Sequence, residues 1–443
     1  NWGIPTFLVW MGEGMRKAIY GFLVLSLLVS GCSLQRTGLS AAPITAQAQA
    51  PAAAPTVTVP APKAAPTTAP SAVPTVLSTT SSESKKDAGV DVGPDTFPAG
   101  VNPLTGLPVK DPDTLKIPPA LVSITNFPPS ARPQAGLSFS PVVYEMYIGE
   151  GTSRFLAVFY GDYPTLADAK DKDQSKNPAV GPVRSGRKPY EALRKLYSGF
   201  LVMASAAEKI ARQLNYVTNV FGSDSDDINS AMVDVTRLEE VARAEQKRLG
   251  DTQLSGQRYA STPPEGGKAG KVLWLPWSFL NQVFWRYDEK TGGYHRWQDN
   301  ADGSTFTEMT DRLTDEPLSF ENVVVLFADH HAEAETVIGI DFLYITKMPA
   351  VVFRDGQMYE VFWNTRNETY EKTTGKIRPI RFMDAQGKPF PLKPGQTWVM
   401  VIGRGIQYNE TVDSTAYFDL KKKTQPGSGI WTFHYYAPPV ETP

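Results

Sequence analysis

Residues 33–99 set the first limit on how this chain can fold. They consist mainly of Ala, Pro, Thr, Ser and Val, with almost no aromatic side chain and few charges. Such a stretch cannot bury enough apolar surface to offset the conformational entropy lost when a chain becomes ordered. We therefore expect a disordered tether over 33–99 and a folded part that begins near residue 100. Proline favours an extended tether, whereas the alanines and threonines favour a slack one.

The residues before the tether have the layout of an export signal. Residues 15–32 contain a basic pair, an apolar run and then Val29-Ser30-Gly31-Cys32. This order is typical of a signal peptide, and the run is shorter than the ~20 residues of a membrane-spanning helix. Residues 1–14 fit poorly ahead of such a signal, so we interpret them as a non-native or mis-called leader.

Cys32 is the candidate for lipid attachment. Its surroundings resemble the bacterial lipobox, which implies that the thiol receives diacylglycerol and that the chain is cut before Cys32. Together with a further acyl chain such as palmitate, this modification provides stable anchoring, because each buried methylene contributes about 0.8 kcal/mol. The alternative is an unmodified thiol in an ordinary cleaved signal or a membrane helix.

Composition limits the classes of function and of fold that are open to the chain. The net charge is −2 and the pI is about 6.2, which argues against nucleic acid as a partner. Cys32 is the only cysteine, which excludes disulfides and thiolate metal sites. The roughly 345 residues after the tether exceed what one core usually holds, so about two domains are expected.

The range 100–261 predicts a mixed α/β sheet domain. Strand-like runs occur at 120–125, 142–147 and 154–160, and an amphipathic helix is expected over 188–200. Thr236 and Glu239 have the spacing of a capping box, which predicts a helix from there to residue 249.

The range 271–437 predicts a mostly β, hairpin-rich domain, so that the whole is of the α+β class. Apolar runs at 283–287 and 294–297 flank one turn, and runs at 351–353 and 358–363 flank Asp355-Gly356. Further strands are expected at 322–327 and 397–402. The Gly- and Pro-rich residues 262–270 are the expected boundary or a large loop.

Several motifs together resemble those of YerB-like lipoproteins, a bacterial family. In the first half these are residues 102–108, 132–137, 143–145, 151–159 and 180–187; in the second half they are 287–294, 322–325, 352–356 and 391–398. The resemblance implies a two-part extracytoplasmic protein on the outer face of the bacterial cytoplasmic membrane, held there by lipid, and it implies no particular activity.

The chain also departs from that family's pattern. Relatives have a strand that ends in His-Ala-Gly-Gly-like residues and, later, a His-Asn pair. The corresponding places here are 203–207 and Ile228-Asn229, and the first domain contains no histidine. Chemistry that depends on those histidines would be lost, whereas binding through arginines would survive.

Arginines are therefore the main candidates for ligand binding. Arg154, Arg184 and Arg187, with Ser185 and Glu145, occur in strand- and glycine-rich segments, and guanidinium groups suit carboxylate or phosphate recognition. In the structural alternative, Glu145 and Glu150 pair with the arginines and hold strand ends together. The pair Arg132-Pro133 fits either interpretation. Ser185 is a weak candidate nucleophile, because neither a nucleophile elbow nor a nearby histidine accompanies it.

Other candidate sites are more simply explained by structure. Asp224, Asp226 and Asp227 lack the glycine and distal glutamate of a calcium loop, and His330-His331 are adjacent strand residues that would point apart. No metal or other cofactor is therefore expected. His295 and His434 are expected to be half-buried. Five tryptophans fit core packing better than sugar binding, with the first two most exposed: Trp274, Trp277, Trp285, Trp297 and Trp363.

Two functions remain. The first is a tethered binding or scaffolding module that contacts an anionic wall polymer or a membrane protein of the envelope through the arginines. The second is an enzyme on an envelope polymer that uses Glu145 or Glu150 as acid or base. Two carboxyl groups ~5–10 Å apart in an open cleft would favour the enzyme, whereas carboxylates held by arginines in a closed network would favour the module.

Overall fold

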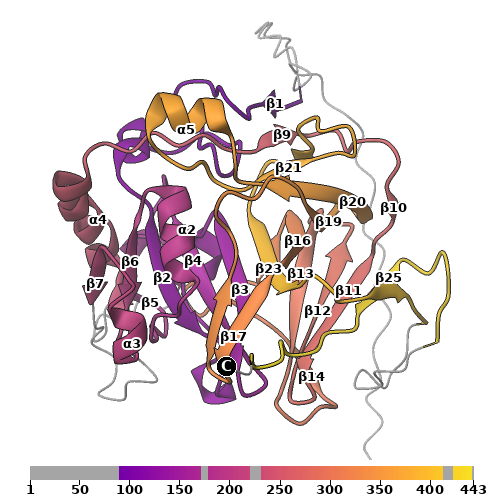
Figure 1. The fold of residues 1–443 in the computed structure, drawn as a ribbon. Coiled ribbons are helices and arrows are strands. Elements are labelled where there is room, and N and C mark those ends of the chain that lie inside the picture. Colours follow the sequence, from indigo (N-terminus) through magenta and orange to yellow (C-terminus); the bar gives the residue numbers. More distant parts are fainter. Residues whose placement is uncertain (1–88, 171–177, 220–230, 413–422, 442–443) are drawn as a thin grey trace, which may run out of the picture. The chain divides into compact units, whose positions relative to one another are not determined.

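The computed structural model describes residues 89–170, 178–219, 231–412 and 423–441 (Figure 1). The chain divides into two compact units, 1–82 and 83–443, and all described residues belong to the second. The predicted signal, Cys32 and most of the tether lie outside the described residues, as do Asp224, Asp226, Asp227 and Ile228-Asn229. None of the helices in the described ranges is both long and apolar enough to span a membrane.

The largest element of the described structure is a sheet of eleven strands. The hydrogen-bonded order of these strands is β10 (Lys268–Ala269), β20 (Gln357–Asn364), β19 (Met348–Arg354), β16 (Asn322–Ala328), β23 (Thr397–Gly403), β3 (Val142–Gly149), β4 (Thr152–Phe159), β2 (Ala120–Thr125), β6 (Phe200–Met203) and β7 (Val217–Asn219), with β21 (Arg381–Met383) beside β20. Strands 120–125, 322–328 and 397–403 occur where the apolar runs predict them.

This sheet joins the two sequence halves. β23 pairs in parallel with β16 on one side and with β3 on the other, in the register Val399 opposite Tyr144. The predicted ranges 100–261 and 271–437 therefore contribute strands to one continuous sheet within one compact unit. The pairing is consistent with the nearly continuous apolar sequence of β16 and β23, because a strand inside such a sheet is buried on both faces.

A second large sheet comes from the later sequence. Its seven described strands lie in the order β14 (Phe306–Glu308), β13 (Gly293–Asp299), β12 (Asn281–Asp288), β11 (Val272–Ser278), β25 (Ile430–Phe433) and β24 (Tyr408–Glu410), with β15 (Ser319–Phe320) beside β13. The predicted hairpins β12–β13 and β19–β20 are both present. The prediction of a β-rich second half is thus confirmed.

Three small sheets complete the described β-structure. They are β1 (Asp91–Val92), β9 (Arg258–Ala260) and β22 (Pro391–Leu392); β17 (His330–Ala334) and β18 (Val337–Ile340); and β5 (Ala179–Val180) and β8 (Val233–Asp234). Because β1 pairs with β9, residues 89–99 are part of the fold. The tether prediction, which extends to residue 99, is wrong for these residues: hydrogen bonds to β9 supply the order that their own sequence does not favour.

Four α-helices and four short 3-10 helices are described. They are α2 (Tyr190–Tyr197), α3 (Glu208–Ala211), α4 (Val235–Leu249) and α5 (Glu368–Thr374), with η2 (Pro112–Lys116), η3 (Pro129–Ala131), η4 (Leu137–Phe139) and η5 (Leu166–Asp168). α2 packs beside β6 through the predicted face that includes Leu193 and Leu196. α4 begins one residue before Thr236, and its cap is Asp234, whose carboxylate accepts from the Thr236 amide. The predicted capping box is therefore wrong, because the cap lies two residues earlier than Thr236.

Tryptophans occupy the core between the sheets. Trp398 of β23 lies with its ring centroid 5.2 Å from that of Trp285 on β12 and 4.9 Å from that of Phe155 on β4. Trp274 and Trp277, which the sequence predicts to be exposed, are 1% and 3% exposed. Their strand β11 is covered on both faces, which a local pattern around Pro276 does not reveal.

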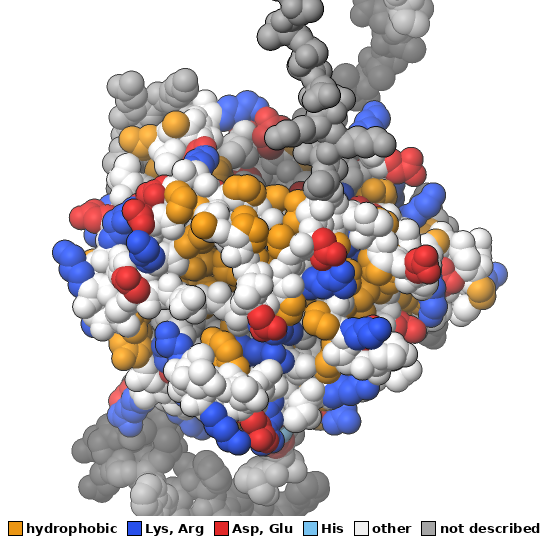
Figure 2. Space-filling view, turned by 90° about the horizontal axis from the view of Figure 1, so that it is seen from above, with side chains coloured by type: hydrophobic (Ala, Val, Ile, Leu, Met, Phe, Trp, Pro, Cys, Tyr) orange, Lys and Arg blue, Asp and Glu red, His pale blue; other side chains and the backbone are white. Residues whose placement is uncertain are grey.

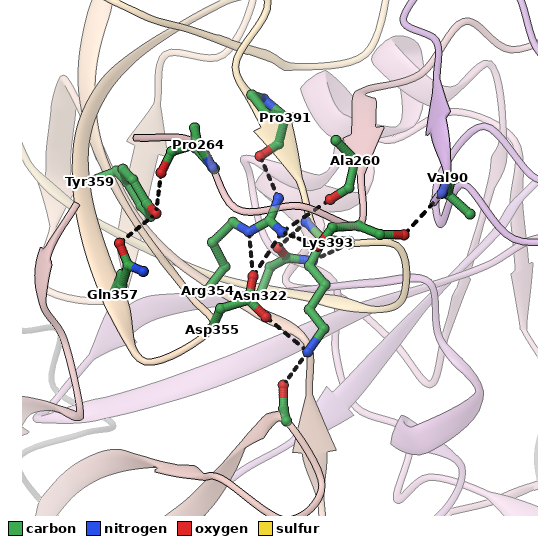
Figure 3. A network of polar contacts seen from close by, with 12 residues as sticks. Val90, Ala260, Pro264, Asn322, Arg354, Asp355, Gln357, Tyr359, Pro391 and Lys393 are labelled. Atoms are coloured by element: carbon green, nitrogen blue, oxygen red, sulfur yellow. Dashed lines mark hydrogen bonds and ion pairs between the residues drawn. The ribbon is translucent and has the colours of Figure 1, made fainter. Parts of the chain in front are cut away.

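A polar network ties β22 and β9 to the large sheet (Figure 3). The guanidinium of Arg354, which is fully buried, donates to the carbonyls of Pro391 (3.1 Å) and Ala260 (3.0 Å) and pairs with Asp355 (2.7 Å). Lys393 pairs with the same carboxylate at 3.0 Å. Each buried cation in this network has an acceptor, so its role is structural.

Candidate functional site

The predicted arginine segments meet at the edge of the large sheet that is formed by the carboxyl ends of β2, β6 and β7. β2, β6 and β7 are parallel neighbours, so their carboxyl ends lie together. Ligand sites in open sheets usually lie at such carboxyl ends. We call the cluster of Arg154, Arg184, Ser185 and Arg187 at this edge the arginine site.

Backbone hydrogen bonds position the segment 183–187 across this edge. The Arg184 amide donates to the Ser123 carbonyl of β2 (2.8 Å), and the Gly186 amide donates to the Ser205 carbonyl after β6 (2.7 Å). Ser185 Oγ lies 2.9 Å from Ser205 Oγ. These bonds place Ser185 and Ser205 at the rim, where Ser205 is exposed.

Arg154 reaches the same segment from β4. It lies opposite Thr125, the last residue of β2, and its Nη1 donates to the Ser185 carbonyl at 3.0 Å. The side chain is 5% exposed, and its Nε has no hydrogen-bond partner. Burial, followed by the positive charges of Arg187 and Arg184, lowers the pKa of Arg154 to about 9.

Arg187 adds a second cation, which is half-buried. Its Nη1 donates to the Gly186 carbonyl at 3.2 Å, and its Nε also has no partner. Burial lowers the pKa of Arg187, while Tyr190 and Glu150 act in the opposite direction. Neither Arg154 nor Arg187 forms an ion pair with a carboxylate in the described part of the chain. Two cations are thus held close together with carbonyls as their hydrogen-bond acceptors.

Lysines widen the positive charge beside the site. Lys188, next to Arg187, and Lys209 of α3 both bind Glu333 of β17, the latter at 2.7 Å. These two lysines hold the pKa of the Glu333 carboxyl down to about 2. The β17–β18 hairpin therefore contacts the neighbourhood of the site through these two ion pairs.

Glu145, in contrast, belongs to a closed internal network. It is fully buried on β3 and pairs with the equally buried Arg296 of β13 at 2.9 Å. It also accepts from Ser153 Oγ (2.8 Å) and Trp398 Nε1 (3.1 Å). The prediction that Glu145 binds a ligand is corrected by this geometry, because its oxygens are committed to internal donors. Its partner is Arg296, which no local sequence pattern distinguishes from other arginines.

The predicted pair of catalytic carboxylates is not assembled. Glu150 is exposed at the β3–β4 turn with φ of 51°, whereas Glu145 is fully buried. An acid or base must reach the proton that it transfers. Glu145 is thus held in a closed internal network, and Glu150 lies at the surface.

The remaining predicted candidates have structural partners. Arg132 Nε donates to the Asn126 carbonyl and Nη1 to the Asp299 carbonyl. On β17, His330 Nδ1 bonds with the Ala328 carbonyl, whereas His331 faces Asp341 and Glu441. The described residues contain no group of three side chains suited to a metal ion.

Comparison with known proteins places the chain in a family. Residues 104–250 match the N-terminal domain, and residues 275–399 the C-terminal domain, of a protein family of unknown function, DUF3048. The chain belongs to this YerB-like family. It is 26% identical to the "Putative lipoprotein YerB" of Bacillus subtilis over 316 residues, 68% of this chain and 85% of the relative.

A solved structure supports the fold. The crystal structure of the B. subtilis YerB protein superposes with a TM-score of 0.51 at 24% identity, covering 68% of this chain and 96% of that one. This match concerns the fold alone. The resemblance predicted from the sequence is confirmed, and it extends through both predicted domains.

Proposed function

We propose that the protein is a lipid-anchored, extracytoplasmic binding module of the bacterial envelope, and that the arginine site contacts phosphate or carboxylate groups of an anionic wall polymer. The observation that carries this proposal is the pair Arg154 and Arg187, each with an unpartnered Nε and no described carboxylate as ion-pair partner. Buried charges without a counter-ion are costly, so an anionic ligand would relieve the strain of their mutual repulsion.

The anchor rests on separate support. Residues 15–32 have the layout of a lipoprotein signal, and the similar B. subtilis protein is described as a lipoprotein. The expected lipid attachment site is Cys32. Incorporation of radiolabelled palmitate into the full chain, and its loss in Cys32→Ser, tests this part by itself.

Binding to wall polymer is tested by co-sedimentation. The full chain in detergent is mixed with purified sacculi, either intact or stripped of their anionic polymers. Arg154→Gln/Arg187→Gln should weaken binding to intact sacculi by at least about tenfold, since hydrogen bonds to charged groups contribute about 1.5–3 kcal/mol each. Arg212→Gln is the matched control, because Arg212 is an exposed arginine of the neighbouring α3 region.

The outcomes separate the candidate partners. Binding that disappears with the stripped polymers and in the double variant supports the proposal, provided that the variant still melts cooperatively. Equal binding by parent, double variant and control returns the arginines to a structural role. If sacculi do not bind but a specific membrane protein cross-links to the parent alone, the wall polymer is the wrong partner.

A further inference from the structure

A second basic pocket lies far along the sequence from the arginine site. It is a hollow of about 290 Å³ lined by residues of β9, β20 and β21 and by the segment that follows β1. Its lining residues include Arg258, Arg378, Arg381, Asn364, Gln257 and Asp95. Its volume is near the lower end for small-molecule sites, about 300 Å³. Figure 2 shows the face on which β1, β9, β21 and α5 lie in Figure 1; apolar side chains gather near its centre, with basic and acidic side chains around them.

Arg378 is the more deeply held cation of this pocket. It is 7% exposed, and its Nη2 donates to Asn364 Oδ1 at 2.5 Å. Its Nε has no hydrogen-bond partner. Burial and the nearby charge of Arg381 lower the pKa of Arg378 to about 10. The carboxamide orients the guanidinium without neutralising it.

Arg381 is paired, but with a partner from the surface. It is 8% exposed; Nη2 donates to the Pro94 carbonyl at 3.1 Å and lies 2.7 Å from Asp95 Oδ1. The side chain of Asp95 is 76% exposed, and Arg381 Nε has no partner. Asp95 therefore supplies a carboxylate to the pocket from a solvated side chain, so that water screens its attraction to Arg381.

We propose that this pocket binds a small oxyanion, a phosphate or carboxylate group, between Arg378 and Arg381, and that the Asp95 carboxylate occupies the same position in the unliganded protein. Each of the two guanidinium groups has an Nε without a hydrogen-bond partner, and guanidinium groups are suited to oxyanion recognition. Arg258 at the pocket wall is already engaged by Asp91, with both bonds at 3.1 Å. The ligand therefore competes with Asp95 for Arg381. Arg378 has no counter-ion in contact in the described structure, so the ligand can pair with it directly.

This inference is independent of the arginine site, since it shares no residue with it. Inorganic phosphate is titrated calorimetrically into the full chain in detergent at constant ionic strength, with dimethyl phosphate and acetate as separate arms. Dimethyl phosphate represents a polymer or lipid phosphodiester, and acetate represents a carboxylate. The proposal requires that at least one of these anions bind with a Kd below about 10 mM.

Three variants decide the result. Arg378→Gln should weaken binding about tenfold, because it removes a charge-assisted hydrogen bond. Asp95→Asn should tighten binding several-fold, because it removes the competing carboxylate while keeping the side-chain shape. Lys388→Gln, which removes the same charge from the exposed turn beside the pocket, should leave the affinity nearly unchanged.

Other results overturn the proposal. If no anion binds, or if Lys388→Gln weakens binding as much as Arg378→Gln, the pocket is not a specific oxyanion site. Unchanged affinity in Asp95→Asn contradicts the proposed competition between the ligand and the Asp95 carboxylate, and this result does not depend on whether Arg378→Gln folds. The anion that binds most tightly identifies the chemistry of the ligand.

Discussion

Replacing Arg296 by methionine should destabilise the protein more than any exposed charge substitution. Arg296 of β13 and Glu145 of β3 are both fully buried and form an ion pair at 2.9 Å. Arg296→Met removes the cation and leaves the carboxylate in the core with only Ser153 and Trp398 as donors. Breaking a buried pair from one side costs about 3–5 kcal/mol.

Aromatic rings around Arg296 also contribute to the expected loss of stability. The Arg296 guanidinium lies 4.7 Å from the ring centroid of Trp398, 5.2 Å from that of Phe155 and 5.4 Å from that of Trp285. Desolvated cation–π contacts contribute about 2 kcal/mol, and methionine regains part of this through sulfur–aromatic packing. We therefore expect a loss of about 3–5 kcal/mol in the free energy of unfolding.

The assay is equilibrium denaturation of the full chain by urea at neutral pH. Arg286→Met on the adjacent strand β12 is the matched control, because Arg286 is exposed and should cost less than about 0.5 kcal/mol. The double variant Glu145→Gln/Arg296→Met removes both charges and should recover most of the loss, since replacing a buried pair by neutral groups is often nearly neutral. A loss below about 1 kcal/mol in Arg296→Met, or no recovery in the double variant, would refute the reasoning.

Two further predictions concern a helix cap and a histidine. Asp234→Ala should lower the free energy of unfolding by about 1 kcal/mol or more and Thr236→Ala by less, because Asp234 caps α4; urea denaturation of both variants measures the difference. Hydrogen bonds to Asp341 and Glu441 raise the pKa of His331, so its stabilising effect is present below the ordinary value of 6.5 and is lost as pH rises through the raised value. The protection factor of the Glu441 amide in hydrogen exchange should fall across that window in the parent and stay constant in His331→Asn.

Local sequence predicted many elements at nearly their observed positions. The strands at 120–125 and 322–328 and the hairpin around Asp355-Gly356 follow from apolar runs and a short turn signal. These features depend on residues within a few positions of one another. The α4 cap was predicted two residues too late, because Asp234 and Thr236 are both good caps and the pairing of β8 decides between them.

The candidate site was only partly predictable. Arginines in glycine-rich segments pointed to Arg154, Arg184 and Arg187, and the fold brings them together. The role of Glu145 was not predictable, because its partner Arg296 is 151 residues away and carries no local signal. The same holds for the pocket of Arg378 and Arg381, which exists only because the segment around Asp95 lies against β21.

The sequence by itself determined the signal layout before Cys32, the family and the positions of most strands, since each depends on short-range pattern. Only the tertiary structure decided that β23 pairs with β3, and so that the two halves share one sheet. Packing and the burial of both faces of the sheet decide which strands pair. The apolar sequence of any one strand is compatible with many possible partners. For that reason the ion pair between the halves and both basic sites could be located only once the chain was folded.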